Sequence, residues 1–254
     1  MNKPYVFITG ATSGIGEACA YAFAKLGYPL ILSGRRTERL EAVKAICELD
    51  SSEVIIQQLD VREFSQVEQM VEGLPSEVKS SIGILINNAG LAVGRDTIDN
   101  GVLDDWNRMI DTNIKGLLHV SKCVIPYLQA NNRGHIFNIA SIAGKEVYPS
   151  GNVYCATKHA VDALSRAMRI DLVNNNIKVT NVAPGAVDTE FSIVRYKGDQ
   201  DKADSTYNGY DPLVAQDVAD IIVFAAMRPK HVNMNDIVIM PTAQASATVF
   251  NIQK

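Results

Sequence analysis

A tyrosine and a lysine stand four positions apart in the stretch "VYCATKHAV", at Tyr154 and Lys158. Side chains at positions i and i+4 of a helix share one face, so this spacing predicts that the two project side by side. A phenol with a pKa of about 10 exchanges protons poorly at neutral pH, and a neighbouring cation favours its ionised form. The pair therefore indicates acid–base chemistry, and Lys158 is expected to lower the pKa of Tyr154.

Two further polar residues could complete such a site. Ser141 ends the apolar run "GHIFNIAS", where its hydroxyl would hydrogen-bond to a substrate oxygen at the edge of a sheet. Asn113 lies among apolar residues of a predicted helix, so its amide is expected to face inward and to need partners; a water leading to Lys158 is one possibility. Taken singly, each of these residues also fits an ordinary structural role, such as core packing or a helix cap.

A glycine-rich turn, "ITGATSGIGEA", follows the first apolar run and opens the first predicted helix. Gly10, Gly14 and Gly16 would let the backbone bring N–H groups and a helix N-terminus against a pyrophosphate. The spacing differs from Gly-x-Gly-x-x-Gly, so a turn that only packs a helix on a strand is the alternative. Its place after the first strand favours nucleotide binding.

Two arginines, Arg35 and Arg36, follow the second apolar run in "LSGRRTERL". Folds that select NAD usually place a carboxylate here for the ribose 2′-hydroxyl, whereas a 2′-phosphate requires a cation. A guanidinium can bind phosphate through two parallel hydrogen bonds. The pair therefore predicts NADP, although two arginines beside Glu38 and Glu41 could also form an ordinary solvated helix face.

The elements that must position these residues alternate between short apolar runs and longer amphipathic ones, which is the pattern of βαβ units in a parallel sheet. The predicted strands cover 5–9, 29–33, 53–59, 83–88, 134–140, 177–183 and 236–240, and the predicted helices cover 14–26, 36–49, 63–73, 103–128, 153–174 and 215–227. The strands lack polar alternation, as expected where helices cover both faces of the sheet. We expect one α/β domain over residues 1–254, in which the long irregular stretch 184–213 forms a substrate lid.

Composition excludes several classes of protein. The chain of 254 residues is 47% hydrophobic and has a formal net charge of −4, and its basic residues are scattered, so nucleic acid is not an expected partner. No apolar run is long enough to span a membrane, and the first strand leaves no room for a signal peptide. The four cysteines and four histidines show no metal-ligand spacing. We therefore expect a cytoplasmic protein with reduced thiols and no metal site.

Together these motifs resemble those of the short-chain dehydrogenase/reductase family. The matching elements are Thr9-Gly10-x-x-x-Gly14-Ile15-Gly16, Asn87-Asn88-Ala89-Gly90, Asn113, Ser141, Tyr154-x-x-x-Lys158 and Pro184-Gly185. The resemblance implies a Rossmann-like, doubly wound sheet of seven parallel strands in the order 3-2-1-4-5-6-7. It also implies a homotetramer and a catalytic tetrad of Asn113, Ser141, Tyr154 and Lys158, with Tyr154 as the general acid or base.

The same resemblance implies how NADP would be bound. The residues expected to contact it are Gly10, Thr12, Ser13, Gly14, Ile15, Gly16, Arg35, Arg36, Asp60, Val61, Asn87, Ala89, Gly90, Tyr154, Lys158, Pro184, Gly185, Val187 and Thr189. Many NADP-preferring relatives carry a basic residue where this chain has Ser13, so the NADP prediction depends on Arg35 and Arg36. Lys158 would also hold the nicotinamide ribose while a hydride passes to or from the substrate.

The substrate is indicated by a narrower resemblance. The stretches "NNAGLAVG", "GNVYCATK" and "DTEFSIVRYKGDQDKADSTY" are similar to those of NADP-dependent 3-hydroxy acid dehydrogenases, which implies serine, allo-threonine, 3-hydroxyisobutyrate or a related small acid. Arg195 in the predicted lid would bind the substrate carboxylate. Equally, Arg195 could pair with Glu190 or Asp199 at the surface.

Two other functions stay open at this point. One is a carbonyl or steroid reductase of the same family, which would prefer apolar substrates and would not need Arg195. The other is a regulator that binds NADPH without turning over a substrate. A complete tetrad argues against the regulator, because a sensor has no use for a tyrosine beside a lysine.

Overall fold

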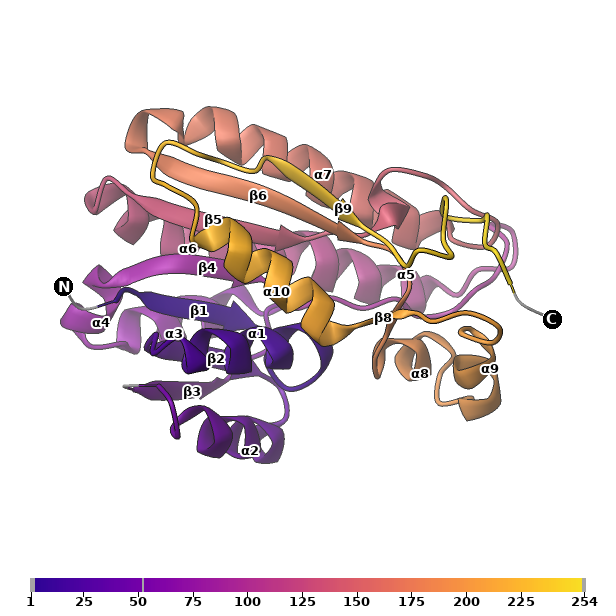
Figure 1. Cartoon of the computed structure of the whole chain (residues 1–254), viewed down its shortest axis with the longest axis horizontal. Helices are drawn as coiled ribbons and strands as arrows, with labels where there is room; N and C mark the ends of the chain where they lie inside the picture. The colour runs from indigo at the N-terminus through magenta and orange to yellow at the C-terminus, as the bar shows by residue number, and fades with distance from the viewer. Residues whose placement is uncertain (1–2, 52, 253–254) are drawn as a thin grey trace.

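A parallel sheet of seven strands forms the centre of the molecule, in the order β3-β2-β1-β4-β5-β6-β9 (Figure 1). The computed structural model describes residues 3–51 and 53–252. The strands are β1 (Tyr5–Thr9), β2 (Leu30–Gly34), β3 (Val54–Gln58), β4 (Ile82–Asn87), β5 (Gly134–Ile139), β6 (Ile177–Pro184) and β9 (Asp236–Ile239). The predicted fold and strand order are confirmed; the last strand is labelled β9 because two short strands precede it.

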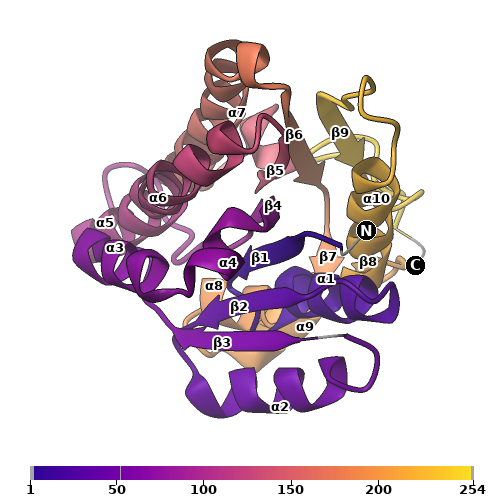
Figure 2. The ribbon, with the colours of Figure 1, turned by 90° about the vertical axis from the view of Figure 1, so that its left-hand side faces the viewer.

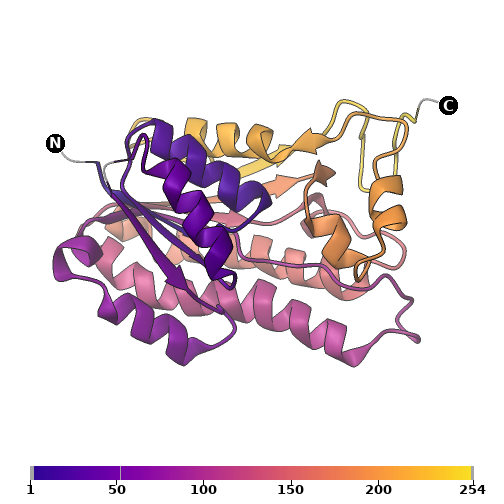
Figure 3. The same ribbon diagram turned by 90° about the horizontal axis from the view of Figure 1, so that it is seen from below.

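Helices cover both faces of this sheet, as Figures 2 and 3 show from two directions. One face is covered by α3 (Phe64–Gly73), α4 (Ser76–Ser80), α6 (Leu117–Ala130) and α7 (Asn152–Asp171), and the other by α1 (Gly14–Lys25), α2 (Thr37–Cys47) and α10 (Ala215–Ala226). Within the described ranges, no helix combines the length and the apolar character that crossing a bilayer requires.

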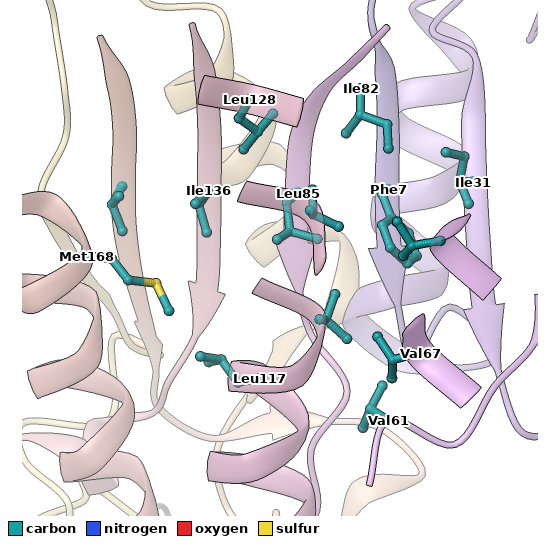
Figure 4. Packing of buried hydrophobic residues seen from close by; sticks show 14 of the residues in the cluster. Phe7, Ile31, Val61, Val67, Ile82, Leu85, Leu117, Leu128, Ile136 and Met168 are labelled. Carbon is teal, nitrogen blue, oxygen red and sulfur yellow. The ribbon is translucent and has the colours of Figure 1, made fainter. Parts of the chain in front are cut away.

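The core divides into two layers because successive strand residues point to opposite faces of a sheet. Phe7 belongs to a buried cluster that includes Leu117 and Leu128 of α6 (Figure 4), whereas its neighbour Ile8 belongs to a second cluster with residues of α1 and α10. Both are fully buried. This two-sided burial is why the strands lack the polar alternation of a half-exposed sheet.

The predicted helix over 103–128 is interrupted. It consists of α5 (Leu103–Ile110), a π-helical turn η1 (Asp111–Gly116) and α6, which continues to Ala130. At the end of the turn, a Cβ added to Gly116 would lie 2.6 Å from Val61 Cγ2, so the backbone approaches the end of the sheet closely here. A single widened turn shifts the helical register only slightly, which is too little for the pattern of apolar residues in the sequence to reveal.

The predicted lid and the C-terminal tail meet at the end of the sheet toward which the strands point (Figure 1). The lid is not irregular throughout: it contains β7 (Val187–Asp188), α8 (Phe191–Arg195), α9 (Gln200–Ser205) and β8 (Leu213–Val214). The tail packs on it through the rings of Tyr210 and Phe250, whose centroids are 5.1 Å apart, and Gln244 Oε1 accepts a hydrogen bond from the Ala186 N–H. This contact was not predicted.

Candidate active site

A cleft of about 870 Å³ lies at the carboxyl ends of the strands, between the sheet, the lid and the tail. This edge is where open α/β sheets bind their ligands. The predicted cofactor residues that line the cleft are Gly10, Thr12, Ser13, Gly14, Ile15, Arg35, Arg36, Asp60, Val61, Ala89, Gly90, Tyr154, Lys158, Pro184, Gly185, Val187 and Thr189. Ser141 and Arg195 line it as well.

The structure places two of the predicted cofactor residues, Asn87 and Gly16, away from the cleft lining, and their contact with the cofactor stays a prediction. The Asn87 amide is buried and donates to Ser121 Oγ and Asn138 Oδ1, at 3.0 and 2.9 Å. A Cβ on Gly16 would lie 2.4 Å from the Gly10 carbonyl oxygen, so this glycine lets the turn pack on its own helix. Asn88 lines the cleft instead.

The glycine-rich turn has the features of an anion cradle. Gly10 and Gly14 have positive φ angles of 66° and 56°, a region that side-chain-bearing residues rarely adopt. A Cβ on Gly10 would lie 2.9 Å from Ala89 Cα. The N-cap residue Ser13 makes no side-chain capping hydrogen bond, so the first N–H groups of α1 are available to an anion in the cleft. The turn therefore fits a dinucleotide pyrophosphate.

The two predicted phosphate-binding arginines have different surroundings. Arg36 donates to the Thr12 carbonyl oxygen at 3.1 Å and forms an ion pair of 2.9 Å with Glu190. Arg35 forms no ion pair with any residue of 3–51 or 53–252. Asp60, which the family resemblance places beside the cofactor, forms an ion pair with Arg62 at 2.6 Å. Although burial opposes it, this contact keeps the pKa of the Asp60 carboxyl below its usual range. The end of β2 is thus cationic, which suits a 2′-phosphate.

Tyr154 and Lys158 lie one turn apart on α7 and both are buried beside the cleft. The Lys158 ammonium lies 5.9 Å from the centroid of the Tyr154 ring. Its Nζ donates to the Ile139 carbonyl oxygen at 2.8 Å, at the end of β5. The helical spacing thus places the two side chains together, as predicted, while the lysine is anchored to the sheet rather than to the tyrosine.

The pKa values of these two groups differ from the prediction. Burial raises the pKa of Tyr154, with a further contribution from Tyr148, and the Ser141 hydroxyl only partly opposes the rise. Burial also lowers the pKa of Lys158 to about 8. The pKa of Tyr154 is therefore raised on balance, not lowered as predicted, because removal from water disfavours the charged form of both groups and burial is the largest contribution.

Ser141 lies on the turn that joins β5 to α7. Its hydroxyl accepts from the Ala143 N–H at 3.1 Å and faces the Pro184 carbonyl oxygen at 3.4 Å. The turn packs tightly on α7, since a Cβ on Gly144 would lie 2.6 Å from the Lys158 carbonyl oxygen. This close approach brings Ser141 to the same part of the cleft as Tyr154.

Asn113 lies in the π-helical turn, behind the cleft rather than on it. Its amide oxygen accepts from the Leu91 N–H at 2.8 Å, and its Nδ2 donates to the Leu91 carbonyl oxygen and to Thr157 Oγ1 at 2.9 and 3.0 Å. The Asn113 amide therefore hydrogen-bonds directly to protein groups; a water leading to Lys158 was the possibility that the sequence suggested. Asn113 links the segment after β4 to α7, one residue before Lys158.

Arg195 lies beside Tyr154 and lines the same cleft. Its guanidinium carbon is 5.5 Å from the centroid of the Tyr154 ring, and Nη2 donates to the Tyr148 hydroxyl at 2.7 Å. Among the described residues, the buried Nε has no hydrogen-bond partner. Sequence reasoning missed Tyr148, which stands in a loop without any periodic pattern.

Among residues 3–51 and 53–252, Arg195 does not form the surface ion pair that was its alternative role. Glu190 pairs with Arg36 and Arg39, and Asp199 pairs with Lys202 at 2.8 Å. Arg195 thus presents a cation to the cleft, whose nearest polar partner is a neutral phenol.

The burial of Lys158 predicts that Lys158→Met stabilises the protein. The pKa of Lys158 is about 8 against 10.5 for an exposed lysine, so at about pH 7 the folded state retains a buried charge at a cost of up to about 3 kcal/mol. Between these two pKa values the folded state has released its proton and the unfolded state has not, so the stability of the unsubstituted protein rises with pH. In urea unfolding, the free energy of unfolding of Lys158→Met should exceed that of the unsubstituted protein at about pH 7, and this difference should be smaller at about pH 9.5. A variant less stable at the lower pH would contradict this.

Comparison with known proteins identifies a common family. A family model described as short chain dehydrogenase matches residues 4–199. The chain is 44% identical over 243 residues to the NADP-dependent 3-hydroxy acid dehydrogenase YdfG of Salmonella typhi, covering 95% of this chain and 96% of that protein. It is also 44% identical to a sulfoacetaldehyde reductase of Chromohalobacter salexigens, covering 94% of each. The closed form of a serine dehydrogenase complexed with NADP+ superposes with a TM-score of 0.92 at 41% identity, over 98% of this chain and 99% of that one.

Proposed function

This chain belongs to the short-chain dehydrogenase family, and from that premise we propose that it is an NADP-dependent oxidoreductase acting on small 3-hydroxy acids of the serine, allo-threonine or 3-hydroxyisobutyrate type. The observation that carries the substrate class is Arg195, a cation without an acidic partner in the described chain, 5.5 Å from the ring of Tyr154. Relatives with 3-hydroxy acid and serine dehydrogenase activity in their names support the same class.

The cleft suits NADP along its length. Gly10, Gly14 and the N-terminus of α1 would hold the pyrophosphate, and Arg35 and Arg36 the 2′-phosphate. By family resemblance, Asp60 and Val61 would lie beside the adenine, and residues 184–189 beside the nicotinamide. When bound, the cofactor supplies or accepts the hydride. The protein contributes position and electrostatics.

Tyr154 would act as the proton carrier for the substrate oxygen. Its raised pKa keeps the phenol protonated at neutral pH, which suits it to donate a proton when a carbonyl is reduced. The Ser141 hydroxyl would hold the same oxygen by a hydrogen bond. In the opposite direction Tyr154 must accept a proton, and the ammonium form of Lys158 would favour the phenolate that does so. Asn113 would hold the end of α7 that carries both residues.

Arg195 would bind the substrate carboxylate through charge-assisted hydrogen bonds. Tyr148 positions it, since the 2.7 Å hydrogen bond to Nη2 orients the guanidinium toward Tyr154. The substrate lid over 184–213 stays a proposal, supported by the location of Arg195 on α8. A single catalytic domain over 1–254, a homotetramer and a cytoplasmic location remain predictions.

A panel of substrates tests this function. Turnover of L-allo-threonine, 3-hydroxyisobutyrate and sulfoacetaldehyde is compared with that of an uncharged secondary alcohol and a steroid, each with NADP(H) and NAD(H), by following reduced nicotinamide absorbance. We expect kcat/KM for the 3-hydroxy acids to exceed that for the uncharged alcohol by at least about 100-fold, the worth of about 3 kcal/mol of charge-assisted binding. A preference for apolar ketones would favour the carbonyl reductase alternative, and the absence of turnover with bound NADPH would favour a regulator.

A further inference from the structure

Glu190 links two segments that are 154 positions apart in the chain. Its Oε2 pairs with Arg36 Nη1 at 2.9 Å and its Oε1 with Arg39 Nη2 at 3.4 Å. Arg36 lies at the turn between β2 and α2, while Glu190 lies at the start of the lid. Both Arg36 and Glu190 line the cleft. The ion pairs therefore join the start of the lid to the β2–α2 turn, beside the arginines proposed to bind the 2′-phosphate.

The neighbours of Glu190 show what this link would hold in place. Thr189 packs on the glycine-rich turn, where a Cβ on Gly14 would lie 3.2 Å from Thr189 Cγ2. Glu190 is itself the N-cap residue of α8, and its carbonyl oxygen accepts from the Val194 N–H at 3.2 Å. The same helix ends at Arg195. A single residue thus connects the arginines of the adenosine end to the helix that carries the proposed substrate ligand.

We propose that Glu190 is a positioning residue that retains the cofactor: its ion pairs with Arg36 and Arg39 hold the lid against the β2–α2 turn and slow the release of a dinucleotide from the cleft. The proposal rests on NADP as cofactor. It also predicts that α8 is held in place before the substrate arrives.

The expected change in the rate of cofactor release depends on how exposed the ion-paired side chains are. The side chains of Glu190, Arg36 and Arg39 are 40%, 46% and 57% exposed, and ion pairs between exposed side chains are weak and are screened by salt. Loss of both pairs together is expected to change a dissociation rate by roughly fivefold to tenfold, equivalent to about 1.0 to 1.4 kcal/mol. Substitution at an exposed position should leave the fold unchanged.

The test measures the rates at which NADPH and NADH dissociate, by displacement of the fluorescent reduced cofactor in a stopped-flow instrument. The variants are Glu190→Gln, Arg39→Gln and the double variant; Arg39 does not line the cleft. Asp201→Asn is the matched control, since Asp201 is an exposed carboxylate of the lid that forms no ion pair within the described chain and does not line the cleft. We expect Glu190→Gln to speed the release of both cofactors by about fivefold at low salt, and Asp201→Asn to leave it unchanged.

Two further results are expected. The double variant should release NADPH no faster than Glu190→Gln, because Glu190→Gln already removes the ion pair that Arg39→Gln would remove. Salt should speed release from the unsubstituted protein more than from Glu190→Gln. The proposal is overturned if Glu190→Gln leaves release of both cofactors unchanged, or slows release of NADPH alone; the latter would mean that the carboxylate competes with the 2′-phosphate for the arginines. If neither cofactor binds the unsubstituted protein, the proposed function fails instead.

Discussion

Tyr154→Phe is expected to lower kcat for hydroxy acid oxidation by about a thousandfold, the middle of the range for a general acid or base, and to leave the affinity for NADPH nearly unchanged. The substitution removes one oxygen from a buried ring that packs against Phe191, with centroids 5.8 Å apart. The ring packing should survive, and only the proton carrier is lost. Steady-state rates together with fluorescence titration of NADPH separate the two effects.

The control for this prediction is Tyr127→Phe. Tyr127 lies on α6, and its hydroxyl donates to Glu72 at 3.1 Å, away from the cleft. Turnover of this variant should equal that of the unsubstituted protein. Unaltered turnover in Tyr154→Phe would refute the role assigned to the tyrosine, whatever the substrate, because no other group in the described cleft combines a buried phenol with a neighbouring lysine and serine.

Arg195→Met is expected to lower kcat/KM for 3-hydroxyisobutyrate by roughly a hundredfold, equivalent to about 3 kcal/mol of lost charge-assisted binding. Turnover of an uncharged secondary alcohol should change by less than about threefold, since it makes no use of the guanidinium. The kcat/KM of Arg195→Lys for 3-hydroxyisobutyrate should lie between the values of Arg195→Met and the unsubstituted protein, because a lysine keeps the charge but cannot form two parallel hydrogen bonds. Tyr148→Phe should show a smaller loss of the same kind through the freed guanidinium.

Arg133→Met provides the matched control for loss of a positive charge, since Arg133 is exposed next to β5 at the opposite edge of the sheet. Its kcat/KM for every substrate should stay unchanged. Equal losses for the acid and the alcohol in Arg195→Met would show that the arginine maintains the shape of the site rather than recognising a carboxylate. The substrate class would then have to be sought elsewhere in the cleft.

Much of the fold and part of the site were determined by the sequence alone. Each strand is an apolar run with few polar positions, and such a run is stable only when both of its faces are buried. The strands therefore predicted a parallel sheet with helices on both faces. Tyr154 and Lys158 share a face because the helical repeat places i and i+4 together, wherever the helix lies. Glycines at the first turn indicated the cradle because few other residues adopt its backbone angles.

Only the tertiary structure decided the state and the partners of these groups. The pKa of Tyr154 is raised rather than lowered because desolvation depends on the atoms that surround a group, and those atoms come from distant segments. Asn87 turned into the core and Asn88 into the cleft, although the two are adjacent and chemically alike. Glu190 forms an ion pair with Arg36 rather than with Arg195. Local spacing determines which face a side chain occupies, whereas its charge and its partner depend on which other elements the fold packs against that face.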